Sequence, residues 1–152
     1  MEIKKFGTAS SSAIQRLEQK YDLALPEDYK DFLYNFNGGL FESTTVVKLK
    51  NMGENINLSI LFGVEGVGVG DENTNVDFWM SEYGDELPPG VVIIGDALEH
   101  GFILLLCEGE ESGIYYWDDT RYFKCSSDEG NTYFIAETFT EFAEKFLLLP
   151  DK

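Results

Sequence analysis

Basic residues are missing from the middle of this 152-residue sequence. No Lys or Arg stands between Lys50 and Arg121, whereas the same span holds fifteen Asp or Glu, and the whole chain has a formal net charge of -17. A one-sided negative field repels nucleic acid and anionic membranes and attracts basic partners. Acidic surfaces also keep proteins dispersed, so solubility alone is the alternative explanation.

Groups that carry metal or nucleophilic chemistry are scarce as well. His100 is the only histidine, and Cys107 and Cys125 are the only cysteines. A zinc site would lack the spacing of known ligand motifs, and a nucleophilic pair would need His100 beside one of the cysteines. We expect His100 in a surface turn, both cysteines as reduced structural thiols, and neither a metal nor another cofactor.

Long hydrophobic runs are also absent. No segment approaches the roughly 18 apolar residues of a membrane span. The first twelve residues, MEIKKFGTASSS, hold two lysines but lack the apolar segment of a secretory signal. We therefore expect a cytoplasmic protein. The chain is 43% apolar with twelve Phe, eight Tyr and two Trp, which excludes a disordered composition and predicts a single domain over residues 1–152.

The best-marked element lies in residues 25–42, LPEDYKDFLYNFNGGLFE. Pro26 suits the first turn of a helix, and Glu27 and Asp28 stand where the helix dipole favours negative charge. Apolar residues recur at i, i+3, i+4 and i+7 and predict a buried stripe of Tyr29, Phe32, Leu33 and Phe36. Residues 37–39, Asn-Gly-Gly, readily take positive φ and end the helix. The segment holds no nucleophile or metal ligand, so we interpret it as scaffold.

The remaining pattern alternates helices with short strands. Further helices are predicted at 12–22, with a capping box at 12–15, at 76–83, capped by Thr74 or Asn75, and from a second capping box at 138–141 to Leu147. Strands are predicted at 44–49, 57–62, 91–94, 102–107, 114–117 and 132–135, and a surface loop at 63–75. The order favours an α+β fold: a mostly antiparallel sheet of about five or six strands, with two N-terminal helices and a C-terminal helix packed on it.

Two ligand motifs are suggested by the sequence and then rejected. Residues 71–82 place oxygen ligands at calcium-loop positions, but the required glycine is replaced by Val76, and the predicted helix at 76–83 uses the same residues. The glycines of residues 63–70 resemble a phosphate loop, but no Lys follows them, and Asp71 and Glu72 would repel phosphate. We expect neither site.

Acidic and aromatic residues of the basic-free span predict a partner-binding surface. Paired carboxylates of a hydrolase could be drawn from Asp96, Glu99, Asp118 and Asp119, but an acidic protein offers many such pairs, and we expect no enzymatic activity. Aromatic residues beside acids are typical of protein interfaces, although a solvated strand face would look the same. The predicted contact residues are Asp71, Glu72, Trp79, Glu82, Tyr83, Asp85, Glu86, Glu108, Glu110, Glu111, Tyr116, Asp118 and Asp119, with Tyr115 and Trp117 as further aromatic anchors.

The order of these motifs resembles the SUKH superfamily, which includes bacterial immunity proteins of polymorphic toxin systems and fungal cell-wall assembly regulators. The resemblance spans nearly the whole chain. It departs from the family pattern at residues 97–100, where more glycine is expected. The matching features are a leading amphipathic helix, Leu25-Pro26, Tyr29, Phe32, Leu33, residues 37–39, 61–63 and 88–94, Asp96, Gly101, residues 114–118, and a closing helix with Thr138, Phe139 and Phe142.

The resemblance implies a binding function. Members of this kind bind and neutralise a cognate toxin domain, often a nuclease or deaminase, and a nuclease that binds phosphates needs a basic surface. The acidic span of residues 51–120 would complement such a surface, so we expect a basic protein toxin as partner, and neither nucleic acid nor a membrane. An intracellular regulatory or scaffold module and a carboxylate-dependent hydrolase are the alternatives.

Overall fold

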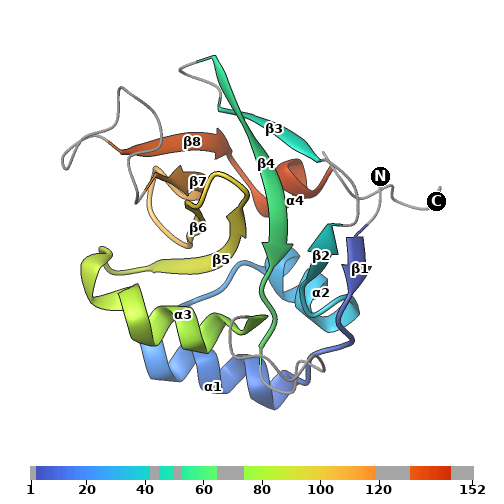
Figure 1. Cartoon of the computed structure of the whole chain (residues 1–152). Helices are drawn as coiled ribbons and strands as arrows, with labels where there is room; N and C mark the ends of the chain where they lie inside the picture. The colour runs from blue at the N-terminus through green and yellow to red at the C-terminus, as the bar shows by residue number, and fades with distance from the viewer. Residues whose placement is uncertain (1–2, 42–44, 50–52, 65–73, 119–130, 145–152) are drawn as a thin grey trace.

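The computed structural model of the chain describes residues 3–41, 45–49, 53–64, 74–118 and 131–144. These residues form a curled, mostly antiparallel sheet with helices on both of its faces (Figure 1). The helix α3 lies against one face, whereas α2 and α4 lie behind the sheet in the view of Figure 1. The predicted α+β class is therefore confirmed.

The sheet has the strand order β1-β2-β4-β5-β6-β7-β8, and β3 pairs with the first half of β4. All of these strand pairs are antiparallel. The strands predicted at 44–49 and 57–62 pair as β3 and β4, and those predicted at 91–94, 102–107 and 114–117 form the consecutive antiparallel strands β5, β6 and β7. Two strands at the start of the chain, β1 and β2, were not predicted. The strands are β1 Ile3–Lys5, β2 Gly39–Phe41, β3 Val46–Leu49, β4 Glu54–Leu61, β5 Val91–Ala97, β6 Phe102–Leu106, β7 Gly113–Trp117 and β8 Thr132–Ala136.

All four predicted helices are present, as α1 Ser11–Tyr21, α2 Glu27–Asn35, α3 Val76–Tyr83 and α4 Phe139–Ala143. The first helix starts close to the predicted position, but the predicted capping box at 12–15 is wrong, because the cap is Ser10. Its hydroxyl accepts a hydrogen bond from Ala13 N at 3.1 Å, and α1 begins at Ser11. Asn75 caps α3, as one of the two predicted residues, and Thr138 caps α4 as predicted. A short 3-10 helix, η2 Gly84–Glu86, continues α3.

The turn after α2 closes the helix as the sequence predicts. Asn37 and Gly38 both have left-handed backbones, with φ of 51° and 87°. The buried side chain of Asn37 accepts a hydrogen bond from Val64 N at 2.8 Å and donates one to Val64 O at 3.1 Å. A Cβ at position 38 would collide with the main chain of Leu61, so this turn requires glycine for its close approach to β4.

The predicted stripe on α2 faces the core. Tyr29, Phe32 and Leu33 are buried, and Phe36 is half-buried at the end of the stripe. The rings of Phe32 and Phe139 lie 5.1 Å apart between centroids, which joins α2 to α4. Both helices thus bury their aromatic residues together behind the sheet.

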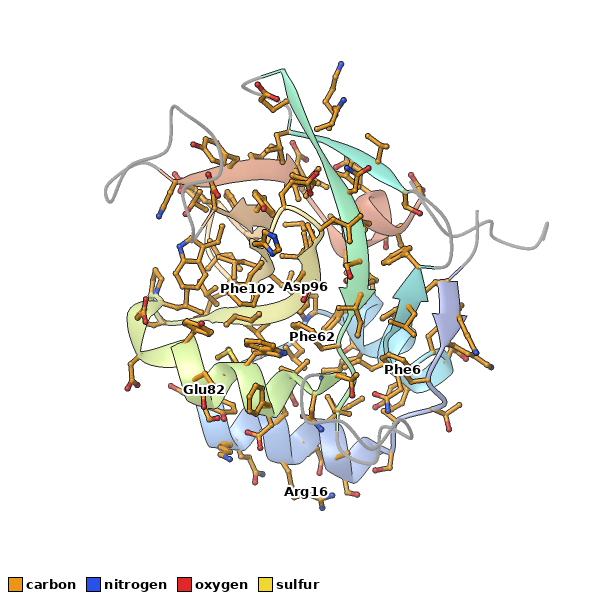
Figure 2. The ribbon with its side chains drawn as sticks, in the orientation of Figure 1. Phe6, Arg16, Phe62, Glu82, Asp96 and Phe102 are labelled. Carbon is orange, nitrogen blue, oxygen red and sulfur yellow. The ribbon has the colours of Figure 1, made fainter. Side chains whose placement is uncertain are left out.

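Five aromatic rings form a continuous cluster between α3 and the other sheet face, and we call it the aromatic ladder: Phe62, Trp79, Tyr83, Phe102 and Trp117. Ring centroids are 5.7 Å apart for Phe62 and Trp79, and 5.2 Å apart for Tyr83 and Phe102. Figure 2 shows Phe62 and Phe102 on the sheet side of α3. The ladder fixes α3, and therefore also the short helix η2 that follows it, against β6 and β7.

A candidate partner-binding groove

A cavity of about 510 Å³ opens next to η2, on the sheet face that carries the aromatic ladder. We call it the groove. Its floor is made by apolar and aromatic side chains of three neighbouring strands, and its rim by residues of the turns around them. The floor residues are Val91, Leu104, Leu106, Tyr115 and Trp117, and the remaining lining residues are Glu86, Leu87, Pro88, Glu111, Asn131 and Thr132.

Strand register explains why these floor residues share one face. Leu106 pairs with Val91 on one side, and Leu104 pairs with Tyr115 on the other. Because side chains alternate between the two faces of a strand, residues at every second position of β6 and β7 point into the groove. The short α3 ends at Tyr83, so the part of this face beyond the ladder is left for the groove.

One wall of the groove comes from η2 and the loop after it. Leu87 N donates to Gly84 O at 3.1 Å, and Cys107 N donates to Gly90 O at 2.9 Å. Gly90 has a φ of 83°, which turns the chain from this wall into β5. Glu86 and Leu87 are thereby held beside the floor.

A further part of the rim comes from the turn between β6 and β7, which adjoins the loop after η2 at Gly90. Its residues Glu108, Glu110 and Glu111 are all exposed, and the turn is closed by a hydrogen bond from Ser112 N to Gly109 O at 3.2 Å. Glu111 lines the groove, so carboxylates from η2 and from this turn meet at the same cavity.

Tyr115 is the best-fixed aromatic residue of the groove. Its hydroxyl donates to the main-chain oxygen of Glu111 at 2.6 Å, and its ring meets Phe134 edge to face with centroids 5.6 Å apart. Burial raises the pKa of Tyr115, and the neighbouring Glu111 raises it further. The hydroxyl therefore stays protonated near neutral pH and keeps its ring in place.

The predicted contact residues fall into three groups. Asp85, Glu86, Glu108, Glu110 and Glu111 lie on the two turns beside the groove and are exposed. Exposed Glu82 and half-buried Trp79 and Tyr83 lie on α3. Asp71, Glu72 and Asp119 lie outside the described residues, as do Cys125, the start of the rejected calcium motif, most of the predicted loop at 63–75 and the predicted end of the last helix at 145–147.

Two of the predicted contacts are wrong. Tyr116 and Asp118 are each 0% exposed, and Trp117 is only 8% exposed. Tyr116 points to the sheet face opposite the groove, because it is one position out of step with Tyr115 and Trp117 on β7. Neither Tyr116 nor Asp118 can reach a partner at the surface.

The aliphatic part of the groove floor was not predicted from the sequence. Val91, Leu104 and Leu106 belong to apolar runs that were interpreted only as strand core. Their signal in the sequence is the ordinary alternation of a strand, which does not show whether a helix covers that face.

Two acidic residues of β5 and its turn have structural roles. The buried carboxylate of Glu99 accepts hydrogen bonds from Asn57 N at 3.0 Å and from Asn57 Nδ2 at 2.8 Å, which ties the turn to β4. Burial raises the pKa of Asp96 to about 6, and a hydrogen bond from Ser59 offsets part of the shift. His100 takes a φ of 74° in the same exposed turn, where it occupies the position expected to favour glycine.

Three further observations concern a nucleophilic cysteine, a metal site and a membrane span. Burial raises the pKa of the Cys107 thiol to about 12, with Glu108 and Glu18 adding to the shift, so the thiol is protonated and weakly nucleophilic. Among the residues that the structure describes, no three His, Cys, Asp or Glu side chains gather as metal ligands would. Within the same part of the chain, no helix is long and apolar enough to cross a membrane.

The fold is α+β, with an acidic-rimmed groove on one face of its sheet. The family model described as "SMI1 / KNR4 family (SUKH-1)" matches residues 8–145. The chain therefore belongs to this family, and the resemblance to the SUKH superfamily is confirmed. Comparison with curated proteins finds no match. Family membership supports an immunity-type or SMI1/KNR4-like role in protein interaction.

Proposed function

We propose that this protein is an immunity protein that binds and neutralises a cognate toxin domain with a basic surface, and that it has no catalytic activity of its own. The observation that carries the proposal is the convergence of carboxylates on the groove. Glu86 and Glu111 line it from two different turns, and Glu108 and Glu110 lie on the second of these turns. No Lys or Arg occurs in residues 51–120 to offset them.

The proposed partner follows from this charge. A nuclease or a nucleic-acid deaminase holds its substrate through phosphate contacts made by Lys and Arg. An acidic protein that binds over those side chains occupies the surface that the substrate needs. Inhibition then requires only tight binding at that surface and no chemical step by this chain.

Charge and apolar contact should contribute to different rates. Long-range attraction raises the rate of encounter and weakens with salt, whereas buried anchors at the centre of an interface set the lifetime of the complex. In this protein the exposed turn acids would govern association. The aromatic and aliphatic floor of the groove, with Tyr115 as its fixed ring, would govern dissociation.

The test uses the product of the toxin gene adjacent to the gene of this protein. Association and dissociation rates are measured at low and high salt for the triple variant Glu108→Gln, Glu110→Gln and Glu111→Gln. We expect slower association with a flatter salt dependence. The matched control removes three exposed acids on α2 and after α4, by Glu27→Gln, Asp31→Asn and Glu144→Gln.

Three results would contradict the proposal. Association that does not depend on salt would mean that the charge serves solubility alone. Equal slowing by the groove triple and by the control triple would mean that net charge matters but the groove does not. Absence of binding to the toxin, with both variants folded, would instead favour a regulatory or scaffold role within the same family.

A further inference from the structure

We propose that the groove is a receptor for an arginine side chain carried on an extended segment of the basic partner. The inference rests on the partner-binding role proposed above and specifies the chemistry of the contact. It combines three features of the groove: an apolar floor, a fixed aromatic ring, and two carboxylates that approach from different elements.

The floor suits the aliphatic part of a long cationic side chain. Leu106 from β6 is half-buried at the floor, and Leu104 and Val91 beside it are 6% and 7% exposed, so all three present apolar atoms to the groove. Arginine buries its methylene groups along such a surface while its charged end stays at the rim. The floor therefore selects a side chain that is long and amphipathic.

The ring of Tyr115 supplies a face for the guanidinium group. Arginine stacks its planar head on aromatic rings, and the contact combines cation-π attraction with dispersion. Because the Tyr115 hydroxyl is bonded to Glu111 O and the ring rests on Phe134, the ring needs little further ordering when a ligand binds. Preorganisation of this kind lowers the entropic cost of association.

The carboxylates supply the hydrogen-bond acceptors. Glu86 and Glu111 both line the groove, and among the described residues neither side chain forms an ion pair or a hydrogen bond. Their oxygens are thus available to the five N–H donors of a guanidinium group. A carboxylate can accept two parallel hydrogen bonds from arginine, which adds geometric specificity to the charge attraction.

Other occupants fit less well. A lysine ammonium is compact and strongly hydrated, so it gains less from an apolar floor and a ring face. A second copy of this chain carries the same net charge of -17 and is repelled. The cavity of about 510 Å³ falls within the usual range for ligand sites, roughly 300–1,000 Å³, so residues beside the arginine also enter it.

The experiment uses short peptides and isotope-labelled protein, followed by NMR. The probe is an acetylated and amidated peptide in which one arginine is flanked by two glycines on each side. Two matched peptides replace the arginine by lysine or by citrulline, which has nearly the same shape but no charge. We expect chemical-shift changes centred on Leu104, Leu106 and Tyr115, with binding of the arginine peptide about tenfold tighter than that of the citrulline peptide.

Variants of the protein assign the contact. Glu111→Gln should weaken binding of the arginine peptide by about tenfold and leave binding of the citrulline peptide unchanged. Tyr115→Ala should weaken both arginine and citrulline binding by removing the ring. The matched control is Asp31→Asn, which removes an exposed charge from α2 at a residue that does not line the groove. We expect the control to change arginine binding less than twofold, or about 0.4 kcal/mol.

The proposal is overturned by any of three outcomes. These are equal affinity for the arginine and citrulline peptides, shift changes spread over the acidic surface without a centre at the groove, and no shift changes at about 10 mM peptide. Failure here is distinguishable from failure of the proposed function. If the toxin binds and the peptides do not, the proposed arginine site is wrong and the immunity role stands. If the arginine peptide binds and the toxin does not, the arginine site stands and the toxin is refuted as the partner.

Discussion

Replacing Phe32 by alanine should destabilise the protein by about 4 kcal/mol. Phe32 is 4% exposed and lies at the centre of the helical layer behind the sheet. Its ring centroid is 6.4 Å from that of Tyr29, 5.2 Å from that of Phe36 and 5.1 Å from that of Phe139. The substitution removes a whole ring from a packed site and breaks the aromatic contact between α2 and α4.

The magnitude follows from burial and from how little the site can collapse. Buried Phe to Ala substitutions cost about 3–5 kcal/mol, and more when the cavity stays open. Here α4 is held on α2 by Asp28, whose carboxylate accepts hydrogen bonds from Thr140 N and from Thr140 Oγ1, each at 2.9 Å. Since this link keeps Phe139 from moving into the space, we expect a value in the upper half of the range.

Urea unfolding followed by circular dichroism measures the effect. The control is Tyr34→Ala, on the same helix but 37% exposed, which should cost less than about 1 kcal/mol. A loss below about 1 kcal/mol for Phe32→Ala would show that the stripe of α2 is not core. Equal losses for the two variants would show that helix propensity, and not packing, determines the result.

Two other substitutions test buried acids. Glu99→Gln should lower the free energy of unfolding by about 1–3 kcal/mol in urea. The glutamine amide has a single oxygen, so it can no longer accept from both donors of Asn57, and its N–H₂ group would face one of them. An unchanged midpoint would refute the role of Glu99. The raised pKa of Asp96, about 6 against 3.8, means that the folded state retains a proton that the unfolded chain releases, so stability falls as pH rises between these values. Asparagine does not titrate, so the stability of Asp96→Asn relative to the wild type should rise by up to about 3 kcal/mol between pH 4 and pH 7 in unfolding measurements. A stability difference that does not change with pH would refute burial as the cause.

The helices and inner strands could be predicted because their patterns are local. The stripe of α2 and its closing residues 37–38 carry periodicity and turn chemistry in a few adjacent positions. The strands β1 and β2 have three residues each and no such pattern. They exist because they pair with each other and β2 pairs with β4, which are contacts between residues far apart in the sequence.

The acids of the candidate site and two of its aromatic residues, Tyr115 and Trp117, were predicted, but its aliphatic floor was not. Exposed acids such as Glu86 and Glu111 are evident from composition, since charged residues are rarely buried without partners. The groove floor depends instead on where α3 stops and on which strand face it covers. Tyr115 and Tyr116 are identical neighbours in the sequence, and only the register of β7 assigns one to the groove and the other to the core.

The curl of the sheet also limits how another polypeptide can attach. The last strand in the order, β8, contacts β3, and Figure 1 shows the two strands side by side at the top of the molecule. The edge at β1 is only three residues long, and its Lys4 and Lys5 are exposed. Short edges that carry lysine discourage strand addition and the aggregation that it starts. We therefore expect a partner to be held through its side chains, without extending the sheet by a strand of its own.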